Sequence, residues 1–275
     1  MVETARLERP RLSRGTVDLR EELVGAVKRD DFALEYQPLI DLQNGSIAAV
    51  EALLRWRHPL LGTIPVADYL PIAEETGLIV PIGERVLDEA CRQLRTWHLG
   101  FSRLPSLSVS INISLRQLGE PGFVKGVAAA LDRWEILAEW LTLELSPGCG
   151  TLVGPATALA HLGVSLVLDD FGAGDTLLDL RVLPITGVKL HAAFVTAAAG
   201  PVEEGVFAEA LLAIAQARRV TTMGKGVETR AQARRLANLG CDLAQGYLYS
   251  KPLGPEGIGT LLSRGVSAGG ARALG

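Results

Sequence analysis

Two adjacent carboxylates stand at the end of a short apolar run. Residues 165–168 read Ser-Leu-Val-Leu, and Asp169 and Asp170 follow directly. A run of this length is typical of a strand buried on both faces. Two like charges at its end repel each other, and a bound cation would relieve the repulsion. Carboxylate oxygens suit hard divalent cations, so the pair indicates a metal site, with an acidic turn as the alternative.

The ends of other predicted strands carry polar side chains of a similar kind. Taken in chain order, these residues are Glu51, Asn112, Glu144, Asp169, Asp170, Lys189, Glu228 and Gln245. Four consecutive strands each contribute a hard oxygen donor, from Glu51 to Asp169, and such donors are the ligands of magnesium, manganese or calcium. We therefore expect these side chains to meet around a divalent cation.

The predicted strands that carry these polar residues alternate regularly with predicted helices. Predicted strands and helices alternate over residues 106–112 and 123–134, 141–145 and 155–162, 164–170 and 176–183, 187–191 and 202–219, 220–226 and 230–239, and 244–249 and 256–263. This alternation predicts parallel β/α units, and their number suits an α/β fold of the (β/α)8 TIM-like barrel type, whose strand ends meet at one mouth. An open doubly wound sheet is the alternative, less favoured because no glycine-rich phosphate loop follows an early strand.

The first part of the chain predicts a departure from a regular barrel. A capped helix begins after Asp18, and strands over residues 32–42 and 46–56 flank Asn44-Gly45, a strong hairpin signal. The first strand should therefore run antiparallel to the second. Helices are expected over residues 66–77 and 82–99.

Composition limits the possible classes of protein. The chain has 275 residues, of which 48% are hydrophobic, and a formal charge of −4. That charge gives no global positive field, so we expect no DNA partner. No apolar run reaches the 18 or so residues of a membrane span, and three scattered cysteines are typical of a reducing cytosol, so we expect a cytoplasmic protein without a membrane span. We expect a flexible arm over residues 1–17, one domain over 18–265 and a flexible tail over 266–275.

Several motifs carry a family resemblance. The sequence Glu51-Ala52-Leu53 within Val-Glu-Ala-Leu-Leu-Arg-Trp resembles the signature of EAL domains, the bacterial phosphodiesterases and receptors for cyclic di-GMP. Further matching motifs are Tyr36-Gln37-Pro38, Ala73-Glu74-Glu75-Thr76-Gly77, Ser110-Ile111-Asn112-Ile113-Ser114, Asp169-Asp170-Phe171-Gly172, Gly226-Val227-Glu228-Thr229 and Gln245-Gly246-Tyr247. The resemblance covers about residues 20–265. It implies a barrel with an antiparallel first strand, cyclic di-GMP as the ligand, and a possible homodimer or protein partner.

The resemblance also implies a role for individual residues. Those matching Glu51, Asn112, Glu144 and Asp169 hold one metal, Mg²⁺ or Mn²⁺, and a second metal bridges those matching Asp169 and Asp170. The residue matching Lys189 orients the attacking water, and those matching Glu228 and Gln245 organise the site. The implied ligand-binding set is Gln37, Leu53, Arg55, Asp170 and Gln245. The implied chemistry is in-line attack of metal-activated water on a phosphodiester, which yields linear pGpG.

The chain departs from the family pattern on this functional face. Lys225 stands where the family has a glutamate that completes the second metal site, so a cation replaces a metal ligand. A buried lysine could become neutral, but it would still be an unusual magnesium ligand. His191 and Pro147 replace an aspartate and a glutamate, and the loop over residues 174–177 lacks the usual tyrosine and serines.

These departures favour one function over two others. We expect a degenerate EAL domain that binds cyclic di-GMP as a receptor or regulatory module, with little or no hydrolysis. An active metal-dependent phosphodiesterase is the first alternative. A protein-interaction module that binds no nucleotide is the second.

Overall fold

The structure is a computed structural model that describes residues 18–101, 107–198 and 202–263. The predicted flexible segments 1–17 and 266–275 lie outside these residues. No helix in the described ranges is long and apolar enough to cross a membrane.

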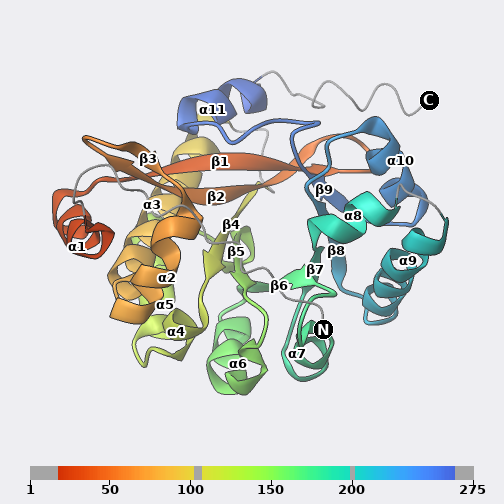
Figure 1. Ribbon diagram of the computed structural model, residues 1–275, viewed down its shortest axis with the longest axis horizontal. Coiled ribbons are helices and arrows are strands. Elements are labelled where there is room, and N and C mark those ends of the chain that lie inside the picture. Colours follow the sequence, from red (N-terminus) through yellow and green to blue (C-terminus); the bar gives the residue numbers. More distant parts are fainter. Residues whose placement is uncertain (1–17, 102–106, 199–201, 264–275) are drawn as a thin grey trace, which may run out of the picture.

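Eight strands close into a barrel (Figure 1). Their order around the ring is β1, β9, β8, β7, β6, β5, β4 and β2, and pairing of β1 with β2 closes it. The strand β1 runs antiparallel to both of its neighbours, and the pairs from β2 round to β9 are parallel. The predicted barrel with an antiparallel first strand is therefore confirmed, and the open doubly wound sheet is wrong. The strands are β1 (Phe32–Asp41), β2 (Ile47–His58), β4 (Ser108–Ile113), β5 (Leu141–Leu145), β6 (Ser165–Phe171), β7 (Gly187–Leu190), β8 (Thr221–Lys225) and β9 (Leu243–Gln245).

The long hairpin of β1 and β2 turns at the predicted Asn-Gly pair. Gly45 has a φ of 75°, a conformation that glycine adopts without strain. The Asp41 carboxylate accepts the backbone N–H of Gln43 at 2.7 Å and so fixes the turn. A short strand, β3 (Gly62–Ile64), extends the outer end of β2 and was not expected.

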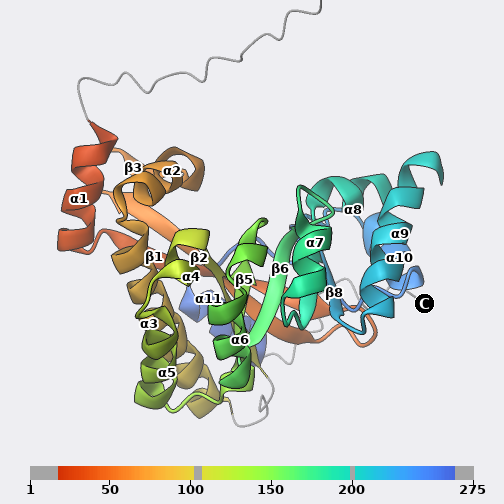
Figure 2. The ribbon, with the colours of Figure 1, turned by 90° about the horizontal axis from the view of Figure 1, so that it is seen from below.

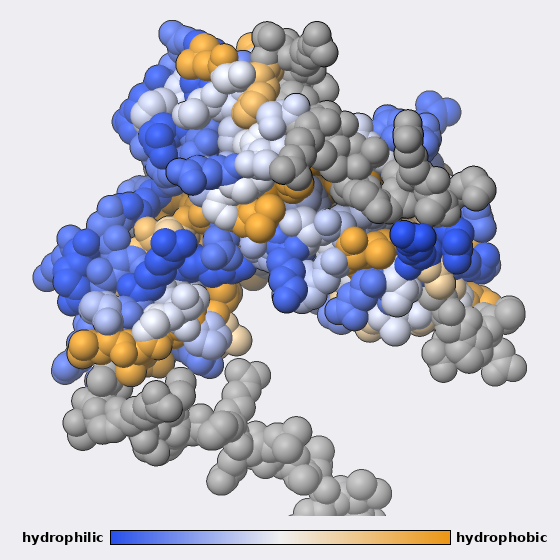
Figure 3. Space-filling view, turned by 90° about the horizontal axis from the view of Figure 1, so that it is seen from above, coloured by the Kyte–Doolittle hydropathy of each residue, from blue (hydrophilic) through white to orange (hydrophobic). Residues whose placement is uncertain are grey.

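Helices surround the ring and also build a lobe beside its mouth. The lobe consists of α1 (Leu19–Arg29), β3 and α2 (Val66–Thr76), on the side opposite α8 (Ala192–Ala198), α9 (Val202–Ala217) and α10 (Arg230–Asn238) (Figures 1 and 2). Between these two parts the surface is notched (Figure 3). The remaining helices are α3 (Ile79–Gly100), α4 (Leu115–Gly119), α5 (Phe123–Trp134), α6 (Val153–His161), α7 (Thr176–Val182) and α11 (Pro255–Ser263), with 3-10 turns at Ala138–Trp140 and Cys149–Thr151.

The interior of the barrel explains where polar side chains must gather. A small apolar cluster consists of Leu39, Ala49, Val167 and Met223, with Leu243 packed against it. Successive residues of a strand alternate between its two faces, so the residue two positions further towards the mouth also points inward. The residues two positions closer to the mouth than these five apolar residues are Gln37, Glu51, Asp169, Lys225 and Gln245. The apolar layer thus forms the floor beneath a polar layer.

Candidate functional site

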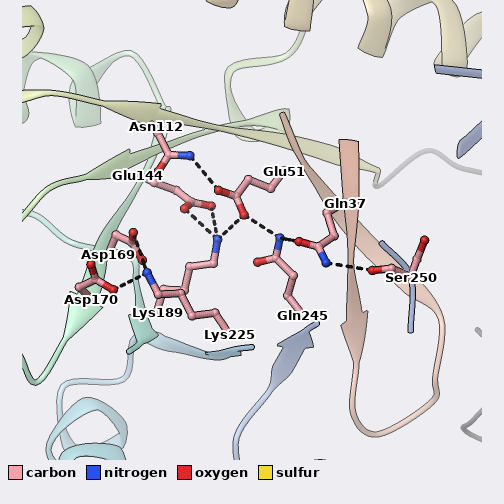
Figure 4. A network of polar contacts seen from close by, with 10 residues as sticks. All are labelled: Gln37, Glu51, Asn112, Glu144, Asp169, Asp170, Lys189, Lys225, Gln245 and Ser250. Atoms are coloured by element: carbon pink, nitrogen blue, oxygen red, sulfur yellow. Dashed lines mark hydrogen bonds and ion pairs between the residues drawn. The ribbon is translucent and has the colours of Figure 1, made fainter. Parts of the chain in front are cut away.

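Lys189 lies at the centre of the polar layer. Its side chain comes from β7 and the residue is only 1% exposed. The ammonium nitrogen donates to Glu51 Oε2 at 2.7 Å and to both carboxylate oxygens of Glu144, at 3.0 and 2.8 Å (Figure 4). Burial favours the neutral amine, but the charges of Glu144 and Glu51 outweigh it and raise the pKa of Lys189. The lysine therefore remains a cation between two carboxylates.

Glu51 is held from three sides. Besides Lys189, it accepts the Asn112 amide at 2.7 Å on Oε1 and the Gln245 amide at 2.6 Å on Oε2. Burial opposes ionisation of Glu51, but the Lys189 charge and these hydrogen bonds lower its pKa. Burial and the neighbouring Glu51 charge instead raise the pKa of Glu144 to about 7. The two carboxylates that share one lysine are therefore electrostatically unlike.

A chain of amides links the site to the strand that closes the barrel. Gln245 Nε2 also donates to Gln37 Oε1 at 3.0 Å, and Gln37 Nε2 donates to the backbone carbonyl of Ser250 at 2.9 Å. Gln37 pairs directly with Glu51 in the hairpin ladder. These contacts tie β1, β2 and β9 together at the mouth, so barrel closure and the position of Glu51 depend on each other.

Lys225 occupies the space beside the paired aspartates. Its ammonium nitrogen lies 2.9 and 3.0 Å from the two carboxylate oxygens of Asp169 and forms an ion pair with Asp170 (Figure 4). Burial favours the neutral amine, but both aspartates outweigh it and raise the pKa of Lys225. These contacts favour the charged form of Lys225 over the neutral form that the sequence left open.

A backbone irregularity aims both aspartates at this lysine. Pairing of β6 with β7 shifts between Leu168 and Phe171, and Asp170 has a φ of 51°. In a regular strand two neighbouring side chains point to opposite faces. The shift lets Asp169 and Asp170 share one cation, and aspartate tolerates this left-handed conformation better than most residues.

The polar layer contains oxygen donors of the kind that a divalent cation prefers. In the part of the chain that the structure describes, no three His, Cys, Asp or Glu side chains are already arranged to hold a metal ion. Glu51, Asn112, Glu144 and Asp169 nevertheless present the hard oxygens that such an ion prefers. Between Asp169 and Asp170, the Lys225 ammonium group contacts both carboxylates.

The remaining predicted residues lie around the polar layer. Leu53 and Arg55 line a pocket of about 360 Å³ together with Asn112 and Asp169. Glu228 is exposed and lines a second pocket of about 360 Å³, which Glu51, Lys225 and Gln245 also line. Two sets of contacts thus hold the predicted metal and ligand residues. Lys189 and Glu51 connect Glu144, Asn112, Gln245 and Gln37, and Lys225 connects Asp169 and Asp170. Leu53 and Arg55 lie outside both sets and line the pocket beside them.

His191 and Glu228 stay outside the network. His191 Nδ1 accepts the backbone N–H of Ala193 at 3.2 Å, so its ring serves the start of α8. Glu228 engages the network through no side-chain contact in the described ranges, and its backbone N–H donates to Gln232. These two predicted catalytic positions are therefore near the mouth but apart from the central carboxylates.

Two further residues near the site were not predicted from the sequence. Glu35 accepts the Arg55 Nε–H at 2.8 Å. Asp179, which is 3% exposed, accepts the backbone N–H groups of Gly148 and Gly150 at 2.7 and 2.8 Å and so holds the loop that follows Glu144 to α7. Two features of the sequence could have indicated them: Glu35 lies two positions before Gln37 and so on the same face of the strand, and Asp179 is an acidic residue within a largely apolar helix.

The EAL domain model matches residues 20–252. The chain belongs to the EAL domain family. The match covers every strand of the barrel. EAL phosphodiesterases are metal-dependent as a class.

Several relatives have names that state an activity. The bifunctional diguanylate cyclase/cyclic di-GMP phosphodiesterase MucR of Pseudomonas aeruginosa is 37% identical over 246 residues, which cover 87% of this EAL chain and 36% of MucR. The cyclic di-GMP phosphodiesterase NbdA of the same organism is 36% identical over 251 residues, covering 88% of this chain and 32% of NbdA. The chain thus spans about a third of the length of these relatives.

Solved structures agree with the fold. The PaMucR phosphodiesterase in complex with c-di-GMP superposes with a TM-score of 0.82 at 36% identity, covering 88% of this chain and all of that one. The EAL domain of Mycobacterium smegmatis DcpA gives a TM-score of 0.70 at 30% identity, covering 84% and 96% of the two chains.

Proposed function

We propose that this EAL domain binds cyclic di-GMP and hydrolyses it slowly or not at all, so that it acts as a receptor or regulatory module. The observation that carries the proposal is the contact of the Lys225 ammonium group with both Asp169 and Asp170. A covalently attached cation fills the position that would otherwise take a metal ion.

The shape of the mouth supports binding. A cyclic dinucleotide carries two bases and two phosphodiesters, and two pockets of about 360 Å³ each adjoin the polar layer. Arg55 lines one of them and offers charge-assisted hydrogen bonds to a phosphate. The complex of the PaMucR phosphodiesterase with c-di-GMP, at 36% identity, is further support.

The charge balance supports a single metal. Glu51, Glu144, Asp169 and Asp170 bring four acidic groups, and Lys189 and Lys225 bring two cations. With all four acidic groups ionised, two formal negative charges remain, which one Mg²⁺ or Mn²⁺ would balance. We assign this ion to Glu51, Asn112, Glu144 and Asp169, where it would supply a charge that lowers the pKa of water.

The same balance argues against rapid hydrolysis. The two cations of a two-metal site together stabilise the attacking and the leaving oxygen, and the charge stabilisation that a metal ion supplies is worth several kcal/mol. Each 1.36 kcal/mol corresponds to a factor of ten in rate. Lys225 supplies positive charge, but its ammonium group has no empty coordination position for a water or a phosphate oxygen. Its proton donors are directed to Asp169 and Asp170.

An active phosphodiesterase is the second candidate. Lys189, Glu51, Asn112 and Glu144 keep their mutual contacts, and relatives at 36–37% identity are named as phosphodiesterases. In this reading one metal, or a second metal completed by water, is sufficient for turnover. An interaction module that binds no nucleotide is the third candidate.

Calorimetric titration with cyclic di-GMP, with and without Mg²⁺ or Mn²⁺, followed by pGpG analysis, separates the three. We expect binding in both conditions, pGpG near background in the wild type, and a higher rate in Lys225→Glu. Recovery should be partial, because His191 and Pro147 remain. Rapid wild-type turnover that Lys225→Glu leaves unchanged would favour the phosphodiesterase. Absence of binding at high micromolar ligand would favour the interaction module.

A further inference from the structure

Glu35 lies on the same face of the hairpin as the expected ligand-contacting residues. In the antiparallel ladder, Glu35 stands opposite Leu53, and Gln37 stands opposite Glu51. Residues two positions apart share a face of the sheet. Glu35 therefore belongs to the face that presents Gln37 and Leu53 to the mouth.

Glu35 also makes a direct contact with Arg55. The residue opposite Arg55 is Ala33, whose methyl group leaves room for a diagonal approach, and a long side chain can reach across such a diagonal. Arg55 Nε lies 2.8 Å from Glu35 Oε2, and the two side chains are 21% and 29% exposed. Glu35 is therefore half-buried beside the pocket that Arg55 lines.

A second contact fixes the guanidinium plane. Arg55 Nη1 donates to the backbone carbonyl of Leu54 at 3.2 Å. A guanidinium group carries five N–H donors in a rigid plane, so two contacts determine its orientation. Within residues 18–101, 107–198 and 202–263, the other Nη1 donor and both Nη2 donors have no protein partner.

We propose that Glu35 is a positioning residue that holds Arg55 for the anionic ligand. This inference rests on the proposed binding of cyclic di-GMP. Glu35 takes the Nε side of the guanidinium group and leaves the Nη edge for a phosphate oxygen. Because an exposed arginine loses much side-chain freedom on binding, an arginine that is already fixed binds its anion at a smaller entropic penalty.

A competing carboxylate would act in the opposite sense. If the phosphate had to displace Glu35 from Arg55, removing Glu35 would tighten binding. The contact geometry disfavours this, because only Nε is engaged by Glu35 and the free donors lie on the other two nitrogens. Positioning and competition thus predict opposite signs for one substitution.

Calorimetric titration of cyclic di-GMP into wild type, Glu35→Ala, Glu35→Gln, Arg55→Ala and the Glu35→Ala/Arg55→Ala double variant tests the proposal. We expect Glu35→Ala to weaken binding by about three- to tenfold, as loss of a partly exposed charge-assisted contact does. Glu35→Gln retains an acceptor oxygen for Arg55 Nε and should remain within about twofold of wild type. In the Arg55→Ala background, Glu35→Ala should have no further effect, because the two residues act through one contact.

A matched control breaks an ion pair away from the mouth. Glu89→Ala removes the partner of Arg92 on α3, a pair with side-chain exposures of 35% and 43%, and should leave affinity unchanged. Thermal unfolding of each variant checks that a changed affinity does not follow from a loss of folded protein.

The outcomes separate the two proposals. Wild-type binding that Glu35→Ala leaves unchanged or tightens would overturn the role of Glu35 and leave the proposed function intact. Equal weakening by Glu35→Ala with and without Arg55 would also overturn it, because the effect would not pass through Arg55. If neither wild type nor Arg55→Ala binds the ligand, both proposals fail together.

Discussion

Two lysines partly neutralise the acidic mouth, but their surroundings differ. Lys189 is 1% exposed and contacts Glu51 and Glu144, whereas the Lys225 side chain is 25% exposed and contacts Asp169 and Asp170. Removing one partner of a buried ion pair leaves an uncompensated charge, and water relieves that penalty near the surface. Lys225 can therefore be replaced with less risk to folding than Lys189.

Lys225→Met tests whether the Lys225 charge relieves the repulsion between Asp169 and Asp170. Without metal, we expect the free energy of unfolding to fall by about 1–2 kcal/mol, because Asp169 and Asp170 then repel each other in a partly buried site. Mg²⁺ should restore part of the loss, since the position can then accept a cation. Urea unfolding in EDTA and in Mg²⁺ measures both effects, with exposed Lys28→Met as the control. Equal stability of Lys225→Met and wild type in EDTA would contradict the ion-pair argument.

The raised pKa of Glu144 predicts a pH dependence of stability. The folded-state pKa is about 7, against 4.5 for an unperturbed glutamate, so between these values the folded state binds a proton that the unfolded state has lost. Stability should therefore fall as the pH rises from about 4.5 to 7. Urea unfolding in EDTA across this range should show the slope in wild type and a smaller one in Glu144→Gln. The same slope in both proteins would assign it to another group.

Most residues of the site could be predicted from the sequence, but their contacts could not. The carboxylates stood at strand ends, where a barrel must bring them together. The sequence shows that residue 225 is a lysine, but its protonation depends on the distances to Asp169 and Asp170. Those distances depend on the register shift in β6, which residue spacing does not predict. Glu35 was not found, because its partner Arg55 lies across a ladder diagonal.

At the scale of elements, regular strands and long helices were the predictable part. Predicted bounds for α5 and β5 match the structure, and the missed elements are short: β3, α4 and α8. Such segments carry too few residues to display a period. The strand predicted over residues 244–249 ends at Gln245, because Gly246 lies against the backbone of Val227. That contact is tertiary and has no local signal.

Gly246→Ala should separate the elements that carry Gln245 and Lys225. A Cβ at Gly246 would clash with the backbone carbonyl oxygen and the backbone nitrogen of Val227. Backbone atoms cannot turn aside as a side chain does, so we expect a loss of about 3 kcal/mol or more in unfolding free energy. Gly254→Ala is the control, since nothing lies within 4 Å of its added Cβ. Equal stability of the two variants in urea would contradict this close contact.

Asp179 links two neighbouring β/α units in a similar way. Its two carboxylate oxygens accept the N–H groups of Gly148 and Gly150, so Asp179→Ala leaves two part-buried donors unpaired. We expect a loss of about 2–3 kcal/mol. Asp175→Ala, at the exposed start of α7 with no side-chain capping bond, should have little effect. Urea unfolding compares the two, and a similar small loss in both would mean that the loop is held by other contacts.

At the scale of the whole molecule, contacts that close the barrel also position residues of the site. Strand β1 meets β9 through only two residue pairs, Ile40 with Ala244 and Asp41 with Leu243. The amide chain from Glu51 through Gln245 and Gln37 to Ser250 adds side-chain contacts across the same join. A ligand that bridges the mouth would therefore stabilise the ring against opening.

This coupling predicts how cyclic di-GMP should stabilise the fold. A ligand that binds only the folded state, at 100 times its Kd, adds about 2.7 kcal/mol to the free energy of unfolding. For a domain of this size, that corresponds to a rise of about 5–10 °C in Tm. Because Lys225 is a covalently attached cation, we expect wild type to show most of this rise in EDTA. Lys225→Glu adds a negative charge in place of a positive one, so its rise should require Mg²⁺ or Mn²⁺. Thermal unfolding of both proteins, with and without ligand and metal, measures the four shifts. If the ligand raises the Tm of wild type only when metal is present, the divalent ion, and not Lys225, offsets the negative charge of the mouth so that an anionic ligand can bind.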